Sequence, residues 1–327
     1  MFFSNDPDWY DRIGKIYLQL ERAKTINESS KYPLRLRREN RILTVSSTTA
    51  IEGNRLTVEQ VFDVIEGKEV FAPIRDIMEV KNAFKAYELL PSFNPWDIND
   101  FLKAHLAISK NLTEEAGCFR SVEVAVVDSS GKTIHKGLPS EEVHESVAKL
   151  LQWGESADIH PIILSAAIHF MIEHIHPFRD GNGRIGRLWQ TLILSKWQPL
   201  FYTFPIETMI RRYQKGYYQA IADSQTIPID CRPFIEYTLN IIEQSLQDIL
   251  ENGGLNGGLN GGLNGGLNLL QQEIISLIRD NPYIKTFDIA QKLKRPVRTI
   301  ENNLRILREK AIIGRQGSKK SGRWIVS

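Results

Sequence analysis

The residues best suited to catalysis in this 327-residue chain lie together between His176 and Arg187, in the stretch H-P-F-R-D-G-N-G-R-I-G-R. This stretch contains one imidazole, one carboxylate, one side-chain amide, three glycines and three arginines. Glycines let backbone N–H groups converge on an anion, and a helix restarting near Arg184 would point its positive end at the same place. Arginines bind phosphate oxygens through forked donors. The composition therefore indicates phosphate chemistry.

Two side chains of the stretch suggest further roles. Asp180 is its only carboxylate, and divalent metals on nucleotides usually take one or two carboxylates together with phosphate oxygens. His176 carries an imidazole, a group that ordinarily titrates near neutral pH and can accept a proton. We expect Asp180 to bind Mg²⁺ and His176 to act as general base. A glycine-rich loop between packed helices, with solvated arginines, is the alternative.

The stretch resembles the signature of the Fic family, H-x-F-x-[D/E]-G-N-G-R-x-x-R, and matches it at every specified position. The resemblance implies a protein adenylyltransferase that transfers AMP from ATP to a Ser, Thr or Tyr hydroxyl of a target protein, which can be the chain itself. It implies ATP and Mg²⁺ as cofactors. It also assigns His176 to catalysis, Asp180 to the metal, and the following residues to the nucleotide phosphates: Gly181, Asn182, Gly183, Arg184 and Arg187.

A second motif, T-T-A-I-E-G-N, lies upstream of the signature. Thr48 and Glu52 stand four residues apart on one helix face, and Gly53 is a suitable left-handed cap. The motif resembles the inhibitory motif [S/T]-x-x-x-E-[G/N] of Fic proteins, whose glutamate pairs with the last signature arginine, here Arg187, and excludes the γ-phosphate. Some family members use this glutamate to remove AMP instead. A solvated, unpaired Glu52 is the remaining possibility.

Two weaker patterns also bear on the site. The valine-rich segment 119–127, a turn at 129–132 and the segment 133–136 predict a β-hairpin. Fic proteins carry a hairpin flap here that binds the target by strand addition, although a purely structural hairpin would satisfy the same residues. Tyr217 and Tyr218 resemble the adenine-side helix of the family, but aromatic residues at this spacing are also typical of a helical core.

Apolar residues at spacings of three and four predict a mainly α fold, a Fic-type helical bundle with a small hairpin flap. We expect Phe178 to anchor the signature loop and His105 to be a packing residue. The predicted parts are an N-terminal helical region with the inhibitory helix (1–90), the catalytic core (91–250), a flexible linker of four G-G-L-N repeats (251–268) and a winged helix-turn-helix domain (269–327).

The last part differs from the rest in charge. Residues 269–327 hold 13 Lys and Arg against 5 Asp and Glu, whereas the remainder holds 28 against 34. In the predicted third helix of this part, Arg295, Arg298, Thr299 and Asn302 have side chains suited to a DNA major groove, and Lys319, Lys320 and Arg323 could reach phosphates. The alternative function is therefore a DNA-binding transcriptional regulator whose Fic body senses nucleotide. Winged helices also serve as protein-docking or dimer modules, so homodimerisation stays open.

Composition sets broader limits. Hydrophobic residues make up 42% of the chain and charged residues 24%, as in ordinary globular proteins. With two cysteines, no disulfide framework or cysteine zinc site is expected. The sequence shows neither a signal peptide nor an apolar run long enough to cross a bilayer, so we expect a cytoplasmic protein without a membrane partner.

Overall fold

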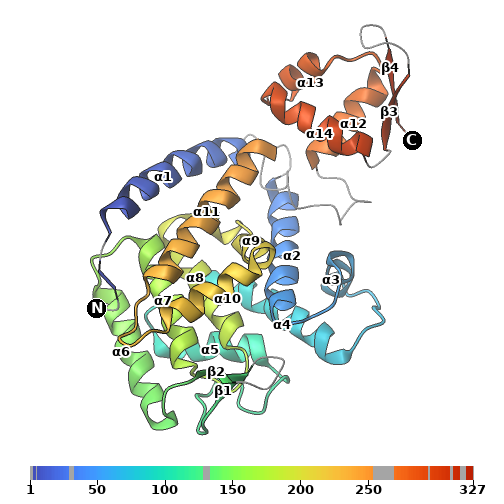
Figure 1. The fold of residues 1–327 in the computed structure, drawn as a ribbon. Coiled ribbons are helices and arrows are strands. Elements are labelled where there is room, and N and C mark those ends of the chain that lie inside the picture. The colour runs from blue at the N-terminus through green and yellow to red at the C-terminus, as the bar shows by residue number, and fades with distance from the viewer. Residues whose placement is uncertain are drawn as a thin grey trace. The chain divides into compact units, whose positions relative to one another are not determined.

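The computed structural model describes residues 3–4, 6–28, 33–127, 133–252, 269–293, 295–309, 312–316 and 322–326. The chain is mainly α-helical, as predicted, and divides into two compact units (Figure 1). One unit comprises residues 1–16 and 40–244, and the other comprises residues 17–39 and 245–327. Most of the predicted repeat linker, residues 253–268, lies outside the described residues. The proposed division into four parts therefore stays a prediction.

The helices up to residue 252 have the following bounds: α1 (Pro7–Glu28), α2 (Pro33–Ile51), α3 (Val58–Ile65), α4 (Ile74–Leu89), α5 (Ile98–Ser109), α6 (Val143–Ser156), α7 (Pro161–Ile175), α8 (Asn182–Trp197), α9 (Ile206–Arg212), α10 (Gln214–Ser224) and α11 (Arg232–Asn252). Three 3₁₀ turns, 90–92, 140–142 and 199–202, join some of them. Helix α9 ends before α10 begins, and Tyr213 separates the two.

Helices α7 and α8 pack against each other at the centre of the first unit (Figure 1). Nearly every residue of α7 is buried, because its sequence is apolar on all faces rather than along one stripe. Pro161 occupies the first helical position, where a missing N–H costs nothing. The signature stretch connects the end of α7 to the start of α8. Two buried helices therefore fix both ends of the candidate catalytic loop.

Three helices lie beside this central pair. Helix α4 packs on α3 and α5, and α5 contacts α8. At the start of α3, Thr57 and Gln60 form a capping box, in which each side chain accepts the other residue's backbone N–H. Arg12 of α1 donates hydrogen bonds to Glu236, Asn240 and Glu243 of α11, which fastens the start of the chain to the last helix of this unit.

The flap is shorter than predicted. Strand β1 (Ala125–Val127) pairs antiparallel with β2 (Thr133–Lys136), and the predicted turn 129–132 lies outside the described residues. Residues 119 and 120 do not extend β1, because they are bound to the signature loop. The Phe119 ring stacks on Phe178, and the Arg120 N–H donates to the Pro177 carbonyl at 3.0 Å.

The second unit ends in three helices and a hairpin, namely α12 (Leu269–Asp280), α13 (Thr286–Lys292), α14 (Val297–Glu309), β3 (Ile313–Gln316) and β4 (Arg323–Val326). The two strands are antiparallel. These elements share a core of their own, which includes Ile274, Ile289, Ile300 and Trp324. Their order is the one expected for a winged helix, although Lys319 and Lys320 lie outside the described residues. Among the described helices, none is both long and apolar enough to cross a membrane.

Candidate active site

His176 caps the C-terminal end of α7 in a left-handed conformation, with φ 53° and ψ 59°. Its backbone N–H donates to Ile172 at 2.9 Å, which closes the helix. The Nδ1 atom lies 3.3 Å from the Glu173 carbonyl oxygen. A proton on Nδ1 would donate to that carbonyl, and Nε2 would then be the unprotonated ring nitrogen. This is the tautomer that a general base requires.

Arg120 holds the backbone of His176 and was not anticipated from the sequence. Its side chain is buried, with the residue 2% exposed, and Nε donates to the His176 carbonyl at 2.7 Å. Nη1 donates to Val122 at 2.8 Å, and Nη2 donates to the Leu138 carbonyl. Burial lowers the pKa of Arg120, and Glu123 offsets only part of this effect. Arg120 therefore ties both arms of the flap segment to the catalytic loop.

The interior of the loop is fixed by neutral contacts. The Asn182 side chain accepts from the Phe178 N–H at 2.9 Å and donates to the Phe178 carbonyl at 2.7 Å. Phe178 is fully buried, as predicted, and stacks on the His105 ring at 3.5 Å. His105 Nδ1 accepts from the Gly117 N–H, and Nε2 lies 2.9 Å from the Asp180 carbonyl. Burial lowers the pKa of His105 to about 4, so it is neutral near pH 7.

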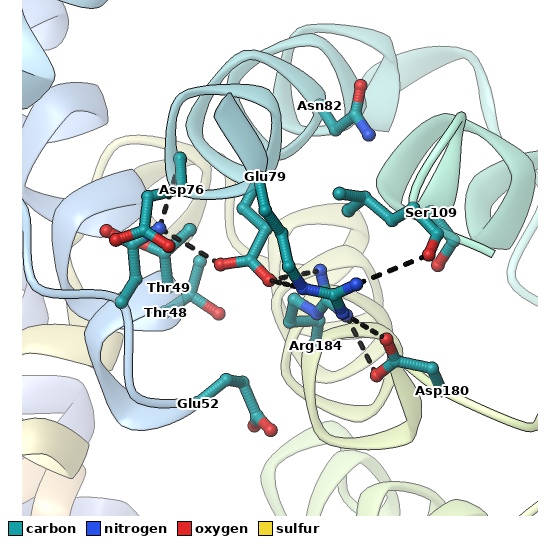
Figure 2. Close-up of polar contacts among 12 residues, drawn as sticks. Thr48, Thr49, Glu52, Asp76, Glu79, Asn82, Ser109, Asp180 and Arg184 are labelled. Atoms are coloured by element: carbon teal, nitrogen blue, oxygen red, sulfur yellow. Dashed lines mark hydrogen bonds and ion pairs between the residues drawn. The ribbon is translucent and has the colours of Figure 1, made fainter. Parts of the chain in front are cut away.

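Asp180 lies between two arginines. Its Oδ1 accepts from Arg184 Nη2 at 3.1 Å, and its Oδ2 accepts from Arg75 Nη2 at 2.8 Å. Burial raises the pKa of Asp180, but the charges of Arg184 and Arg75 outweigh burial and hold it below the ordinary value. Figure 2 shows Arg184 between Asp180 and Glu79 of α4, whose Oε1 lies 3.9 Å from Arg184 Nη1. The carboxylate is therefore ionised and 41% exposed.

Arg187 contacts both residues of the predicted inhibitory motif. Its Nε donates to Thr48 Oγ1 at 3.0 Å, and Nη2 donates to the Thr48 carbonyl at 3.1 Å and to Glu52 Oε1 at 2.7 Å. Gly53, with φ 93°, supplies the left-handed turn that follows Glu52. Burial lowers the pKa of Arg187, but the Glu52 charge and its neighbours more than compensate, so the pKa is raised. Thr48 and Glu52 thus bind a permanently charged, buried guanidinium.

The Glu52 carboxylate also lies on the first turn of α8. A Cβ atom added to Gly183 would lie 2.4 Å from Glu52 Oε1 and 3.1 Å from Arg187 Nη1. Glycine is therefore required for this close approach. The N-terminal turn of a helix carries partial positive charge and binds anions, so Glu52 occupies a place that would suit a phosphate.

The buried arginines keep unused donors. Arg184 and Arg187 are 3% and 1% exposed, and within the described part of the chain Arg184 Nε, Arg184 Nη1 and Arg187 Nη1 are buried without a hydrogen-bond partner. Buried donors in native proteins are normally satisfied, and an outer anion would satisfy these. The residues present therefore fit the phosphates of a nucleotide. For Mg²⁺, the described residues contain no cluster of three His, Cys, Asp or Glu side chains, so Asp180 would bind it together with phosphate oxygens.

The two candidate tyrosines of α10 differ in exposure. Tyr217 is 1% exposed, and its hydroxyl lies 3.1 Å from Glu173 Oε1 and 3.1 Å from His169 Nε2. Tyr217 thus packs in the core, the arrangement that its spacing also allowed. Tyr218 is 49% exposed and donates to the Ile51 carbonyl at 3.2 Å, which lies beside Glu52.

The fold and the site define a class of protein: a helical bundle with a glycine- and arginine-rich anion-binding loop that ends α7 and begins α8. The Fic/DOC family model matches residues 95–194, which include this loop. The chain also resembles a solved Fic family protein from Desulfovibrio desulfuricans G20, with 32% identity, a TM-score of 0.73 and coverage of 100% of this chain and 98% of the other. The chain belongs to the Fic family.

Curated relatives carry adenylyltransferase names. Protein adenylyltransferase fic-1 of Caenorhabditis briggsae is 30% identical over 65% of this chain and 42% of its own length. Protein adenylyltransferase Fic of Nematostella vectensis is 29% identical over 62% of this chain and 47% of its own. The chain thus spans less than half the length of these curated relatives. The solved structure of Fic-1 from C. elegans is 26% identical to this chain, with a TM-score of 0.57, and the match covers 74% of this chain and 72% of the other chain.

Proposed function

We propose that this protein is an adenylyltransferase that transfers AMP from ATP to a hydroxyl side chain of a target protein. The observation that carries the proposal is the placement of an exposed carboxylate, two buried arginines with unused donors and His176 on one loop. The adenylyltransferase names of the curated relatives support the same reaction.

In the proposed reaction, Arg184 and Arg187 bind the outer phosphates through their unused donors, beside the backbone of Gly181 and Gly183. Asn182 keeps the loop in shape through its two bonds to Phe178. Bound Mg²⁺, held by Asp180, would neutralise phosphate charge. His176 takes the proton from the target hydroxyl as that oxygen bonds to the α-phosphorus, and the bond to the leaving pyrophosphate breaks.

We further propose that Glu52 restrains this reaction. The Glu52 carboxylate uses Arg187 Nη2 and lies on the turn of α8 where a phosphate would bind. Because the carboxylate occupies this place, a phosphate that binds Arg187 Nη1 there displaces Glu52 and breaks its contact with Nη2. Because Glu52 stays in the site, removal of AMP from a modified target is a second candidate reaction. Release of AMP from a pre-modified target, with Glu52→Gln as the inactive control, separates removal from restraint.

Labelling tests the transfer directly. We expect purified Glu52→Gly protein to incorporate label into itself or a lysate protein from ATP labelled at the α-phosphate, and none from ATP labelled at the γ-phosphate. Label from the γ-position would instead indicate phosphorylation. His176→Ala in the same background is the matched control and should incorporate neither label. Retained α-label in that control would contradict the role of His176.

We propose that the β1–β2 hairpin receives the target segment by strand addition, since its first arm is fastened to His176 through Arg120. A target strand paired with the hairpin would then be held at a fixed position relative to His176, the proposed base.

We also propose that the protein acts in a reducing, cytoplasmic setting, because Cys118 and Cys231 are both free thiols.

DNA binding by residues 269–327 is a second candidate function, and the surface of α14 favours it. Arg298, Arg305 and Arg308 of this helix and Arg315 of β3 are exposed and line a common groove. The charge of this surface would match phosphates, and Asn302, which lines the same groove, would meet base edges.

Gel-shift titration at several salt concentrations tests this function. We expect full-length protein to retard duplex DNA and the affinity to fall steeply with salt. Arg298→Ala should weaken the shift, and Arg279→Ala, at an exposed position of α12, should not. Equal shifts for both variants, or for protein lacking residues 269–327, would contradict DNA binding through α14.

A further inference from the structure

The α4 helix contributes charged residues to the candidate site that no motif of the sequence identifies. Arg75, in its first turn, reaches Asp180 with Nη2 at 2.8 Å. Glu79, one turn later, lies 3.9 Å from Arg184. Asp180, the expected metal ligand, therefore faces Arg75, and Arg184, an expected phosphate ligand, faces Glu79. In each pair the α4 side chain has the opposite charge. Figure 2 shows Glu79 and Asp180 on either side of Arg184.

Three contacts determine where the Arg75 guanidinium lies. Nε is 3.4 Å from Glu79 Oε1, Nη1 donates to the Leu112 carbonyl at 3.4 Å, and Nη2 donates to Asp180. Glu79 is itself held, because Asn54 Nδ2 donates to its Oε2 at 3.0 Å. Arg75 is nevertheless 56% exposed, so its side chain can leave without disrupting the core.

Asp180 is thereby fully engaged by positive charge. Arg184 takes Oδ1 and Arg75 takes Oδ2. Arg184 is 3% exposed and belongs to the buried part of the loop, whereas Arg75 comes from a separate helix and lies largely in solvent. A divalent cation that binds Asp180 therefore meets a second, movable cation at the same carboxylate. A divalent cation and the Arg75 guanidinium repel each other when both contact one carboxylate, so the guanidinium must move before the metal binds with full affinity.

From these contacts we propose that Arg75 is an internal competitor of the divalent metal at Asp180, and that it sets how strongly nucleotide binding depends on Mg²⁺. The inference rests on the proposed function, since it requires that ATP and Mg²⁺ bind at the signature loop. It is separate from restraint by Glu52, because Arg75 acts on the metal carboxylate and Glu52 acts on Arg187. Loss of Arg75 should leave metal-free ATP binding unchanged and strengthen binding in the presence of Mg²⁺.

Isothermal titration calorimetry of the full-length protein with ATP, once with EDTA and once with saturating Mg²⁺, measures this dependence. The measure is the ratio of the dissociation constant in EDTA to the dissociation constant in Mg²⁺. Arg75→Met keeps the length of the side chain and removes its charge. Because the ion pair is largely exposed, we expect the ratio to rise about two- to fivefold over the wild type. Lys81→Met, which removes a positive charge from an exposed position of the same helix, should leave the ratio at the wild-type value.

The outcomes are distinguishable. An unchanged ratio in Arg75→Met overturns the inference alone. Weaker ATP binding in EDTA for that variant also overturns it, because Arg75 would then be a phosphate ligand. Failure of every chain to bind ATP in either condition would contradict the proposed function and, with it, this inference. Thermal unfolding of Arg75→Met confirms that the fold is intact, since an exposed arginine contributes little to stability.

Discussion

The contact between Glu52 and Arg187 predicts opposite changes in stability and ATP affinity when the glutamate is replaced. At 2.7 Å it joins a guanidinium that is 1% exposed to a carboxylate that is 33% exposed. Exposed ion pairs contribute at most about 1 kcal/mol, and breaking a fully buried pair costs about 3 to 5 kcal/mol. A pair with one buried partner lies between these limits, at about 2 kcal/mol.

ATP must break the same pair before its phosphate engages Arg187, so removing Glu52 removes that cost from binding. A saving of about 2 kcal/mol corresponds to about a thirtyfold lower Kd. We expect this change in Glu52→Gly. Glu52→Gln retains an uncharged hydrogen-bond acceptor for Arg187 and should lower Kd by about tenfold. Both variants should also unfold at lower temperature, because Arg187 stays buried without its counter-charge.

The assay is titration calorimetry with ATP and Mg²⁺ in a His176→Ala background, which prevents turnover during the titration. Glu59→Gln, at an exposed position of neighbouring α3, removes an equal charge and serves as the control. Lower stability of the Glu52 variants with unchanged ATP affinity would refute the reasoning. The pair would then be a structural contact that ATP binding never disturbs.

Three further predictions concern the loop and its supports. In Gly183→Ala the new methyl group enters the space 2.4 Å from the Glu52 carboxylate, where a phosphate should bind. ATP affinity measured by calorimetry should therefore stay weak even when Glu52→Gly is combined with it. Recovery of tight binding would contradict a phosphate site there. In Arg120→Lys the Nε–H donor to the His176 carbonyl is lost, so AMP transfer should slow by about tenfold or more while ATP affinity stays unchanged. Parallel losses of transfer and ATP affinity would instead indicate general unfolding. Burial lowers the pKa of His105 to about 4 from an ordinary 6.5, so its contribution to stability is complete above pH 6.5 and is lost as pH falls toward 4. Between pH 7 and pH 5, the free energy of unfolding of the wild type should therefore fall by about 2 kcal/mol more than that of His105→Gln. Equal losses in the two proteins would exclude this role.

The signature loop could be located from the sequence because its chemistry is concentrated in twelve consecutive residues. Its geometry is local, since a helix end, a glycine turn and a helix start follow one another in the chain. Glu52 could be connected to Arg187 only through the family resemblance, because the two lie 135 residues apart and the contact depends on how α2 meets α8. The burial of Phe178 followed from its apolar side chain within a polar loop.

Other site residues could not be predicted from one sequence. Arg120 has the appearance of any arginine before a strand, and only the fold shows that its acceptors are the carbonyls of His176, Val122 and Leu138. Arg75 resembles a solvated residue at the start of a helix until α4 is placed beside the loop. The strand predicted from Phe119 was too long for the same reason, because tertiary contacts with the loop replaced strand pairing.

The adenylyl transfer reaction itself is tested most directly by comparing incorporation of α-labelled AMP by wild-type, Glu52→Gly, and Glu52→Gly/His176→Ala proteins under the same conditions. We predict weak incorporation by wild type, strong incorporation by Glu52→Gly, and none by the double variant. Equal labelling of the last two proteins would show that His176 is not the base. No labelling by any of the three, with ATP binding intact, would contradict the proposed reaction.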